Sequence, residues 1–428
     1  MTSKGPPRDR ELPKRSLRYG AMSKVGRLRV FRQGLGAVAL LAALAMPSAV
    51  RAGALDVGIV YADPALARPA SGGGGANAAN ALHDGLRDGL RQYRERWGNL
   101  PQLEVPAGPV LRPGADGARV RALRHRLGLA GDGGFDAELA AAVRAYQAAH
   151  NLPDDGVAGA RTIASLNRGA AYYERLIELN LERAAALPAD LGRRYVLVDA
   201  AAARLWMYED GEPVDSMRVI VGRPDAQTPM MASLIRYAVL NPYWNVPDDL
   251  VRSRIAPNVL RQGLPYLRER GYELLSGWAE DAPQLDPATV DWAAVAAGRQ
   301  RLRVRQRPGT GNMMGEVKFR MPNDLGIYLH DTPDRALFEA GDRRLSSGCV
   351  RLEDAQRLSR WLFGRRVAAS STDPEQRVDL REPVPIYITY FTAAPSEGGG
   401  VAFRHDVYGR DEALLARLDT RREIASSD

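Results

Sequence analysis

The hydrophobic pattern of this chain changes its period once, and that change limits the folds available to it. Up to about residue 187, apolar residues recur every three or four positions, as at Leu82, Leu86 and Leu90, which is the spacing of one helix face. From Arg194 onward apolar and polar residues alternate, as between Arg204 and Tyr208, and this period predicts strands. Since 428 residues exceed one ordinary domain, we expect an α+β protein of several domains.

A compact helical unit is predicted between residues 106 and 168. Val120 and Leu123 lie on the apolar face of a first helix, and Asp136 is the expected N-cap of a second. A short third helix carries Ile163. Three short helices of this kind form a small bundle.

The β-rich part of the chain is interrupted once. Residues 247–305 contain several prolines and read as helices and loops, so we interpret them as a helical insertion between strands of a β-sandwich-like domain. Changes in composition and period then divide the whole chain. The predicted divisions are a leader at 1–52, an N-terminal scaffold region at 53–105, a three-helix domain at 106–168, a helical connector at 169–193, the β-rich domain at 194–395 and a C-terminal tail at 396–428.

The net charge of +8 comes from the leader. Residues 1–52 carry eleven basic and two acidic residues, so the rest of the chain is close to neutral. A nucleic-acid partner would require a basic stripe in the folded part, and none is found, which argues against such a partner. The basic stretch precedes an apolar run from Leu35 to Met46, the pattern of a signal peptide or an N-terminal anchor. We therefore expect export to the periplasm, with an inner-membrane tether as the alternative.

Cys349 is the only cysteine in the sequence. An exported chain with one cysteine cannot form an internal disulfide, so the thiol needs another explanation. It is buried and inert, paired with another molecule, or a reactive nucleophile.

The residues around Cys349 favour the nucleophile. His330 ends a predicted strand and supplies an imidazole that can take the thiol proton. Gly348 permits a tight turn just before the cysteine, where backbone N–H groups form an oxyanion hole. Tyr328 lies two positions before His330 on the same strand face, and its hydroxyl is a further candidate donor. Arg351 offers a guanidinium fork to a substrate carboxylate.

Two parts of the chain resemble known families. The helical unit is similar to the peptidoglycan-binding three-helix module, and the segment from His330 to Arg351 resembles the signature of the L,D-transpeptidase (YkuD-type) catalytic domain. The second resemblance is to the large periplasmic subfamily that joins such a module to a catalytic domain with a capping insertion. The matching residues are Phe135-Asp136, Ala142-Val143, Tyr146-Gln147, Asp155 to Thr162, Asn241 to Val246 with Pro247, Lys318-Phe319, Pro322-Asn323, Ile327 to Pro333, Ser346-x-Gly348-Cys349-Val350-Arg351 and His405 to Gly409.

The catalytic resemblance implies roles for single residues. It implies that Cys349 is the acyl-enzyme nucleophile and His330 the base, with Arg351 and Ser346 as candidate substrate-binding residues. Many family members have histidine where this chain has Ser347, and no role is transferred to that side chain. Many have glycine or serine after the catalytic histidine, whose carbonyl orients the imidazole. Asp331 occupies that position here and is expected to do the same.

The resemblance also implies a reaction. Cys349 attacks the third residue, a diamino acid, of a tetrapeptide stem, D-alanine leaves, and a second stem accepts the acyl group in a 3→3 cross-link. No metal or cofactor is expected. Residues 247–305 form a lid over the donor groove, carbapenem-type β-lactams are expected inhibitors, and cell-wall synthases are candidate partners.

Two other interpretations stay open. The first is an L,D-carboxypeptidase or another cell-wall thiol hydrolase. His330 precedes Cys349 by 19 residues, whereas a papain-like enzyme places its cysteine near the mature N-terminus and its histidine far downstream. The second is a peptidoglycan-binding protein without catalytic activity.

Overall fold

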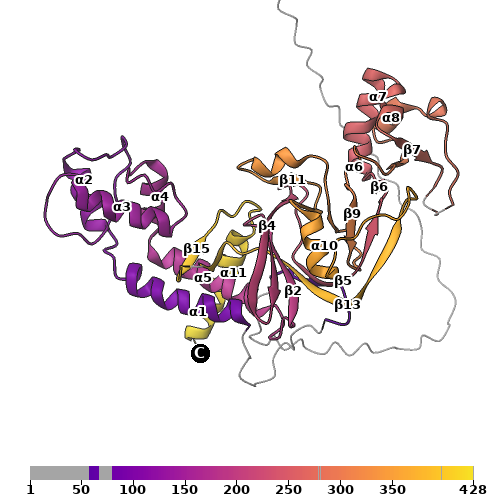
Figure 1. Ribbon diagram of the computed structural model, residues 1–428. Coiled ribbons are helices and arrows are strands. Elements are labelled where there is room, and N and C mark those ends of the chain that lie inside the picture. The colour runs from indigo at the N-terminus through magenta and orange to yellow at the C-terminus, as the bar shows by residue number, and fades with distance from the viewer. Residues whose placement is uncertain (1–56, 67–79, 278, 280, 397, 428) are drawn as a thin grey trace, which may run out of the picture. The chain divides into compact units, whose positions relative to one another are not determined.

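The computed structural model describes residues 57–66, 80–277, 279, 281–396 and 398–427 (Figure 1). The predicted leader at 1–52 and the glycine run Gly72 to Gly75 lie outside the described residues. Among the helices that are described, none combines the length and the apolar character that a membrane span requires.

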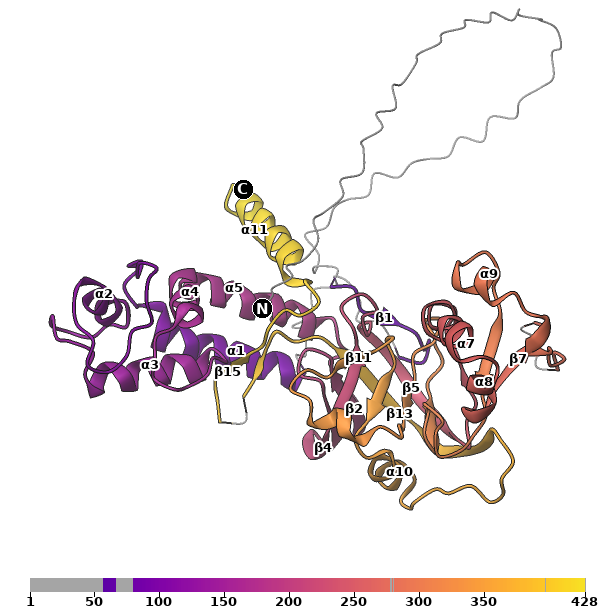
Figure 2. The same ribbon diagram turned by 90° about the horizontal axis from the view of Figure 1, so that it is seen from above.

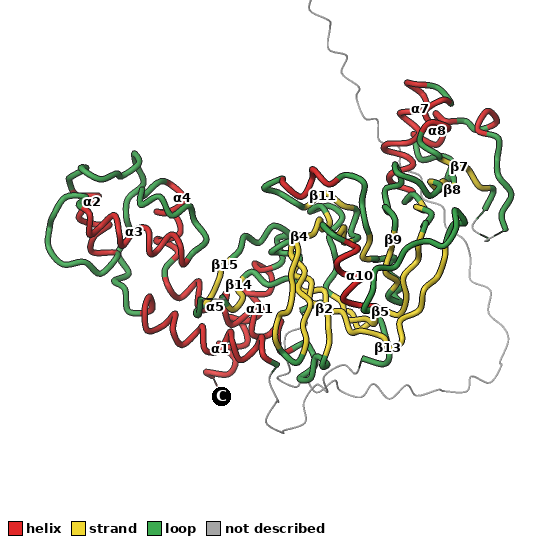
Figure 3. The backbone as a smooth tube through the Cα atoms, in the orientation of Figure 1, coloured by secondary structure: helices red, strands yellow, loops and turns green. Residues whose placement is uncertain are grey.

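Helices dominate the chain before residue 190, as the period of the sequence predicts (Figure 3). The Asp136 side chain accepts a hydrogen bond from the Leu139 N–H and caps the third helix, which confirms the predicted N-cap. A π-helical turn, Arg94–Gly98, follows the first helix. The helices are α1 (Ala81–Tyr93), α2 (Ala118–Arg126), α3 (Ala137–Ala149), α4 (Ala160–Arg168) and α5 (Ala170–Ala185).

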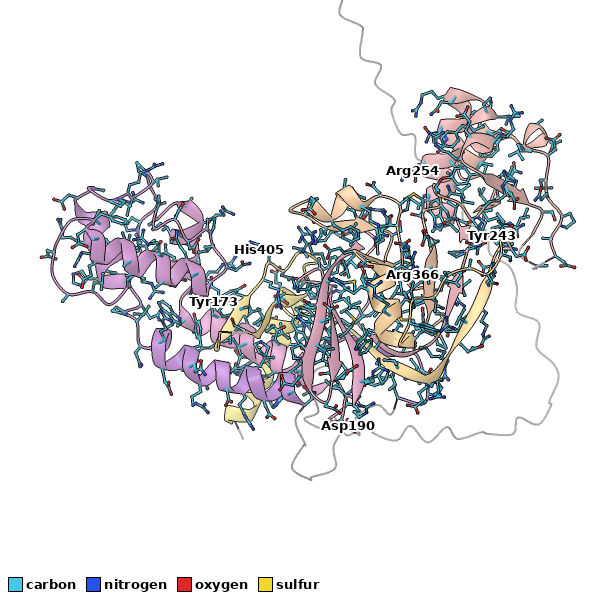
Figure 4. All side chains as sticks on the ribbon, viewed as in Figure 1. Tyr173, Asp190, Tyr243, Arg254, Arg366 and His405 are labelled. Atoms are coloured by element: carbon cyan, nitrogen blue, oxygen red, sulfur yellow. The ribbon has the colours of Figure 1, made fainter. Side chains whose placement is uncertain are left out.

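The helical bundle does not have a core of its own. His150, at the end of α3, is hydrogen-bonded through Nε2 to the Tyr93 hydroxyl of α1 at 3.0 Å. Its ring also stacks on Phe403 from the C-terminal tail, with 5.5 Å between ring centroids. Tyr173 of α5, labelled in Figure 4, contacts the same two rings. One continuous apolar core therefore joins the bundle, α1, α5 and the tail.

The β-rich domain is one sheet that closes on itself. Along the sheet the order is β1-β5-β13-β2-β3-β4-β12-β10-β9, and β5 also pairs with β9. Because β9 pairs back onto β5, the sandwich-like domain has no free edge between these two strands, and β1 is added to β5 outside the closed part. The strands are β1 (Val60–Tyr61), β2 (Arg194–Asp199), β3 (Arg204–Glu209), β4 (Glu212–Gly222), β5 (Met231–Leu240), β9 (Val317–Arg320), β10 (Leu329–His330), β11 (Arg344–Ser346), β12 (Val350–Leu352) and β13 (Gln376–Thr389).

Alternation along these strands separates core from surface. Phe319, Leu329 and Val350 are fully buried inside the closed sheet. The residues that alternate with them along each strand, which include His330 and Arg351, project from the outer face. Helix α10 (Ala355–Phe363) packs Leu358 and neighbouring residues against the same core.

The insertion has its own core and contains more strand than the sequence predicts. Residues 301–305 resume alternation at the end of the predicted helical insertion, and the strand they lead into pairs within the insertion instead of with the closed sheet. The structure therefore adds short strands to the helices and loops that the sequence predicts for this insertion. Figure 2 shows these elements together. They are β6 (Trp244–Asn245), α6 (Asp248–Leu250), a π-helical turn (Val251–Ile255), α7 (Ala256–Gln262), α8 (Pro265–Glu269), β7 (Tyr272–Leu275), α9 (Trp292–Ala296) and β8 (Arg303–Gln306).

The tail forms a hairpin and a helix. Strands β14 (Ala393–Pro395) and β15 (Val401–Phe403) pair with each other, and the charged end of the chain is helical in α11 (Asp411–Ser427). Arg175 of α5 forms an ion pair with Asp419 of α11 at 3.0 Å. The tail is thus attached to the connector helix.

Candidate active site

Strand register brings the predicted site residues together on the outer face of the sheet. Strands β10 and β12 are parallel and pair His330 with Arg351, while β9 pairs Lys318 with His330. One step back along the strands, the Tyr328 carbonyl accepts a hydrogen bond from the Val350 N–H at 3.0 Å, which sets Tyr328 beside Cys349. Side chains two residues apart share a strand face, so the imidazole and the thiol project from neighbouring strands on one side.

A tight turn presents Cys349. The Ser346 hydroxyl donates to the Cys349 carbonyl at 2.6 Å and accepts from the Gly348 N–H at 3.2 Å. Gly348 has a φ of +108°, a backbone conformation that would be strained in any residue with a side chain. Ser346 is 2% exposed, so its hydroxyl is consumed inside the turn. The geometry corrects its predicted role as a substrate-binding residue to one of shaping the turn.

The turn is also held from another strand. The Thr228 hydroxyl, which is fully buried, donates to the Gly348 carbonyl at 2.8 Å and accepts from the Gly222 N–H of β4 at 2.8 Å. The Tyr408 hydroxyl of the tail donates to the Gly222 carbonyl at 2.7 Å. The tail therefore supports the turn that carries Cys349 through β4.

Only one of the two expected oxyanion donors is free. The Gly348 N–H is directed at Ser346, while the Cys349 N–H has no partner among the described residues. The Cys349 N–H is thus the available backbone donor beside the sulfur. The turn itself uses the Gly348 N–H, so the expected pair of oxyanion donors stays a prediction that rests on the Cys349 N–H.

The Cys349 thiol is half-buried and has a specific set of neighbours. It donates to the Gly326 carbonyl at 3.5 Å. Burial raises the pKa of the thiol, while the Tyr328 backbone N–H and the Arg351 charge act in the opposite direction. Asn323 shapes the loop that carries Gly326, since its side chain accepts from the Ile327 N–H at 3.0 Å.

His330 is held in one orientation. Its Nδ1–H donates to the Asp331 carbonyl at 2.6 Å, because a carbonyl can only accept. This leaves Nε2 unprotonated in the neutral ring. Burial, with the positive charges of Arg351 and Lys318, lowers the pKa of His330 to about 3. The imidazole is therefore neutral at neutral pH.

The Asp331 carboxylate has a separate structural task. Its oxygens accept from the Glu316 N–H at 2.9 Å and from the Arg335 guanidinium at 2.5 Å. A Cβ at Gly315 would lie 2.3 Å from this carboxylate, so the approach requires glycine. Asp331 thus contributes its carbonyl to His330 and its carboxylate to the adjoining loop.

Arg351 and Tyr328 face different neighbours from those expected. Within the described chain Arg351 has no carboxylate at ion-pair distance. Its pKa is lowered by burial and also by Arg254 of the insertion, which is labelled in Figure 4. The Tyr328 ring lies 4.7 Å from the guanidinium of Arg320. The side chain of Tyr328 is thus engaged with Arg320, and its backbone N–H serves the sulfur.

Two family models match the chain. Residues 193–386 match the L,D-transpeptidase catalytic domain named YkuD, and residues 117–166 match a domain described as "Putative peptidoglycan binding domain". The first match contains the whole site described above. The second coincides with α2, α3 and α4.

A curated relative and several solved structures are also similar. A Haemophilus influenzae protein named "Putative L,D-transpeptidase" is 33% identical over 232 residues, which are 52% of this chain and 46% of the relative. This chain therefore spans about half of that relative. An L,D-transpeptidase structure from Mycobacterium smegmatis is 15% identical, with 46% of this chain and 58% of that chain covered and a TM-score of 0.23. L,D-transpeptidase 3 from Mycobacterium tuberculosis, in complex with a faropenem-derived adduct, is 13% identical, with 46% and 60% covered and a TM-score of 0.22.

Proposed function

The chain combines an L,D-transpeptidase catalytic domain of the YkuD type with a peptidoglycan-binding domain, and on this premise we propose that it cross-links peptidoglycan through an acyl-enzyme on Cys349. The products are 3→3 cross-links made from tetrapeptide donors. The observation that supports this best is the arrangement of His330, whose Nε2 is left free by the Nδ1–H bond to the Asp331 carbonyl.

The first half of the proposed reaction makes a thioester. The Cys349 sulfur attacks the carbonyl carbon of the diamino acid, and the thiol proton passes to His330 Nε2. The developing oxyanion is stabilised by the Cys349 N–H. The peptide bond to D-alanine then breaks, and the leaving amine takes the proton from His330.

The second half reverses these roles. The side-chain amine of another stem attacks the thioester carbonyl and gives a proton to His330. The carbon–sulfur bond breaks, the sulfur recovers the proton, and an amide joins the two stems. Water in place of the amine gives a carboxypeptidase product.

The surrounding residues have proposed tasks in the same reaction. Arg351 binds the terminal carboxylate of the donor, and the insertion at 247–305 covers the groove and excludes water from the thioester. Carbapenem-type β-lactams acylate Cys349, because they offer a strained carbonyl to the thiol. The protein works in the periplasm, where the bundle binds the cell wall.

Incubation with a disaccharide-tetrapeptide, followed by mass spectrometry, tests the proposal. The wild-type protein is expected to give a cross-linked dimer with release of D-alanine, and Cys349→Ala is expected to give neither. Tripeptide without dimer would identify a carboxypeptidase. Absence of both products, with no carbapenem adduct, would leave a wall-binding protein without catalytic activity.

A further inference from the structure

Arg320 is a cation without an anion on the face that carries the nucleophile. It ends β9, is half-buried, and has no carboxylate at ion-pair distance within the described residues. Apart from Arg351, the neighbouring cations on this face are paired. Lys318 binds Glu375 at 2.9 Å, and Arg377 binds Asp379 at 2.6 Å.

Two tyrosines hold Arg320 in place. Tyr237 of β5 is its register partner, and the Tyr328 ring lies 4.7 Å from the guanidinium carbon. Burial alone would lower the pKa of Arg320, but its interactions with Tyr237 and Tyr328 outweigh burial and raise it. Neutral tyrosines support the guanidinium without neutralising it, and its fork of N–H donors is suited to a carboxylate.

The position of Arg320 relative to Cys349 follows from the register. Arg320 ends β9, while Tyr328 and Cys349 directly precede β10 and β12, so the three residues lie in one row across the outer face. Neighbouring strands are about 4.8 Å apart, so the backbones at Arg320 and Cys349 are separated by roughly 10 Å. Arg351 lies in the adjoining row, on β12, the strand that directly follows Cys349.

We propose that Arg320, held between Tyr237 and Tyr328, binds a second carboxylate of the donor peptide, separate from the terminal carboxylate assigned to Arg351. This inference rests on the proposed function. A stem peptide has two further sources of such a group. One is a carboxylate on the side chain of the diamino acid, and the other is the free carboxylate of the acidic residue that precedes it.

Binding of three peptides to protein that lacks the nucleophile tests this subsite without turnover. The peptides are a free tetrapeptide, one amidated on the diamino-acid side chain, and one amidated on the preceding acidic residue. Calorimetry compares Cys349→Ala with Cys349→Ala/Arg320→Gln. Loss of a charge-assisted hydrogen bond is expected to weaken the free tetrapeptide about tenfold or more.

The identity of the carboxylate follows from the amidated peptides. The peptide amidated at the recognised group should bind weakly to Cys349→Ala, and Arg320→Gln should then change its Kd by less than about twofold. The other amidated peptide should behave like the free one. Arg320→Lys, which keeps the charge and loses the fork, should give an intermediate loss and guards against a misfolded glutamine variant.

Arg377→Gln is the matched control. It removes a guanidinium from the same face, but one that is paired with Asp379 and lies 3.9 Å from the Tyr237 ring centroid, so peptide binding should change far less than in Arg320→Gln. The inference is overturned if Arg320→Gln and Arg377→Gln have equal effects, or if Arg320→Gln weakens all three peptides alike. Failure of the proposed function would appear elsewhere, as binding without any reaction by the wild-type enzyme.

Discussion

At the scale of single residues, burial sets the charge of the two groups proposed to react. A buried site penalises the charged form, which for a thiol raises the pKa and for an imidazole lowers it. Both shifts are present, in Cys349 and in His330. A thiolate–imidazolium ion pair is therefore disfavoured in the free protein, and in the proposed reaction the proton moves only when the sulfur attacks.

The reactivity of Cys349 toward iodoacetamide, a neutral reagent, should therefore follow the thiolate fraction alone. Between pH 6 and pH 9 the rate should rise about tenfold per unit, with no plateau, because the pKa lies above the ordinary value. His330→Ala should change this rate little, yet slow acylation by a tetrapeptide by about a hundredfold or more. A rate that is already constant between pH 5 and pH 8 would show that the ion pair is formed in advance.

At the scale of elements, one hydroxyl connects strand β4 to the turn that carries Cys349. Thr228 bridges the Gly222 N–H and the Gly348 carbonyl in a fully buried position. Thr228→Val keeps the shape and leaves both backbone groups unsatisfied, at a cost of about 1–3 kcal/mol each. We expect the free energy of unfolding to fall by about 2–6 kcal/mol, and acylation of Cys349 to slow as the turn loosens.

Urea unfolding and the rate of carbapenem acylation measure these two effects. Thr289→Val is the control, because that hydroxyl lies in an exposed turn of the insertion. Equal losses in the two variants would mean that burial of the bridge contributes nothing. An unchanged acylation rate in Thr228→Val would show that the turn keeps its geometry without the bridge.

The groups proposed to react can be predicted from the sequence, but most of the residues that position them cannot. Cys349 and His330 stand out by residue type, and the position after His330 draws attention to Asp331. The role of Thr228 depends on a bond across 120 positions of sequence, and no local pattern marks it. Arg320 reads as an ordinary surface residue until the register of β5, β9 and β10 places two tyrosines beside it.

Local periodicity also has a definite limit at the level of the fold. It predicted α3 with its cap and the change from helix to strand. It could not predict that β5 pairs with β9 and closes the sheet, because pairing partners depend on contacts distant in sequence. For the same reason, alternation over residues 301–305 indicates a strand there, but it does not predict that the partners of β8 lie inside the insertion.

At the scale of the whole molecule, a buried ion pair joins the connector helix to the tail. Arg183 of α5 is fully buried and lies 2.8 Å from Asp411 at the start of α11. Its guanidinium also donates to the Thr392 hydroxyl at 3.1 Å. The pair adjoins the core shared by the bundle, α1, α5, the tail and the outer side of β2, so we expect all of these to unfold in one transition.

Arg183→Met should lower the free energy of unfolding by about 3–5 kcal/mol, because it leaves Asp411 buried without its partner. Adding Asp411→Leu should recover a large part of that loss, since an apolar pair of similar size tolerates the same burial. Arg175→Met is the matched control on the same two helices, because its pair with Asp419 is 36% exposed on both sides and should contribute less than about 1 kcal/mol. Urea unfolding followed by circular dichroism gives all four values.

If the double variant is no more stable than Arg183→Met, the cost arises from lost packing around α5 and not from the unpaired Asp411 carboxylate. Two separate transitions in the wild-type protein would show that the bundle unfolds without the sheet. That result would contradict the single transition expected from the shared core.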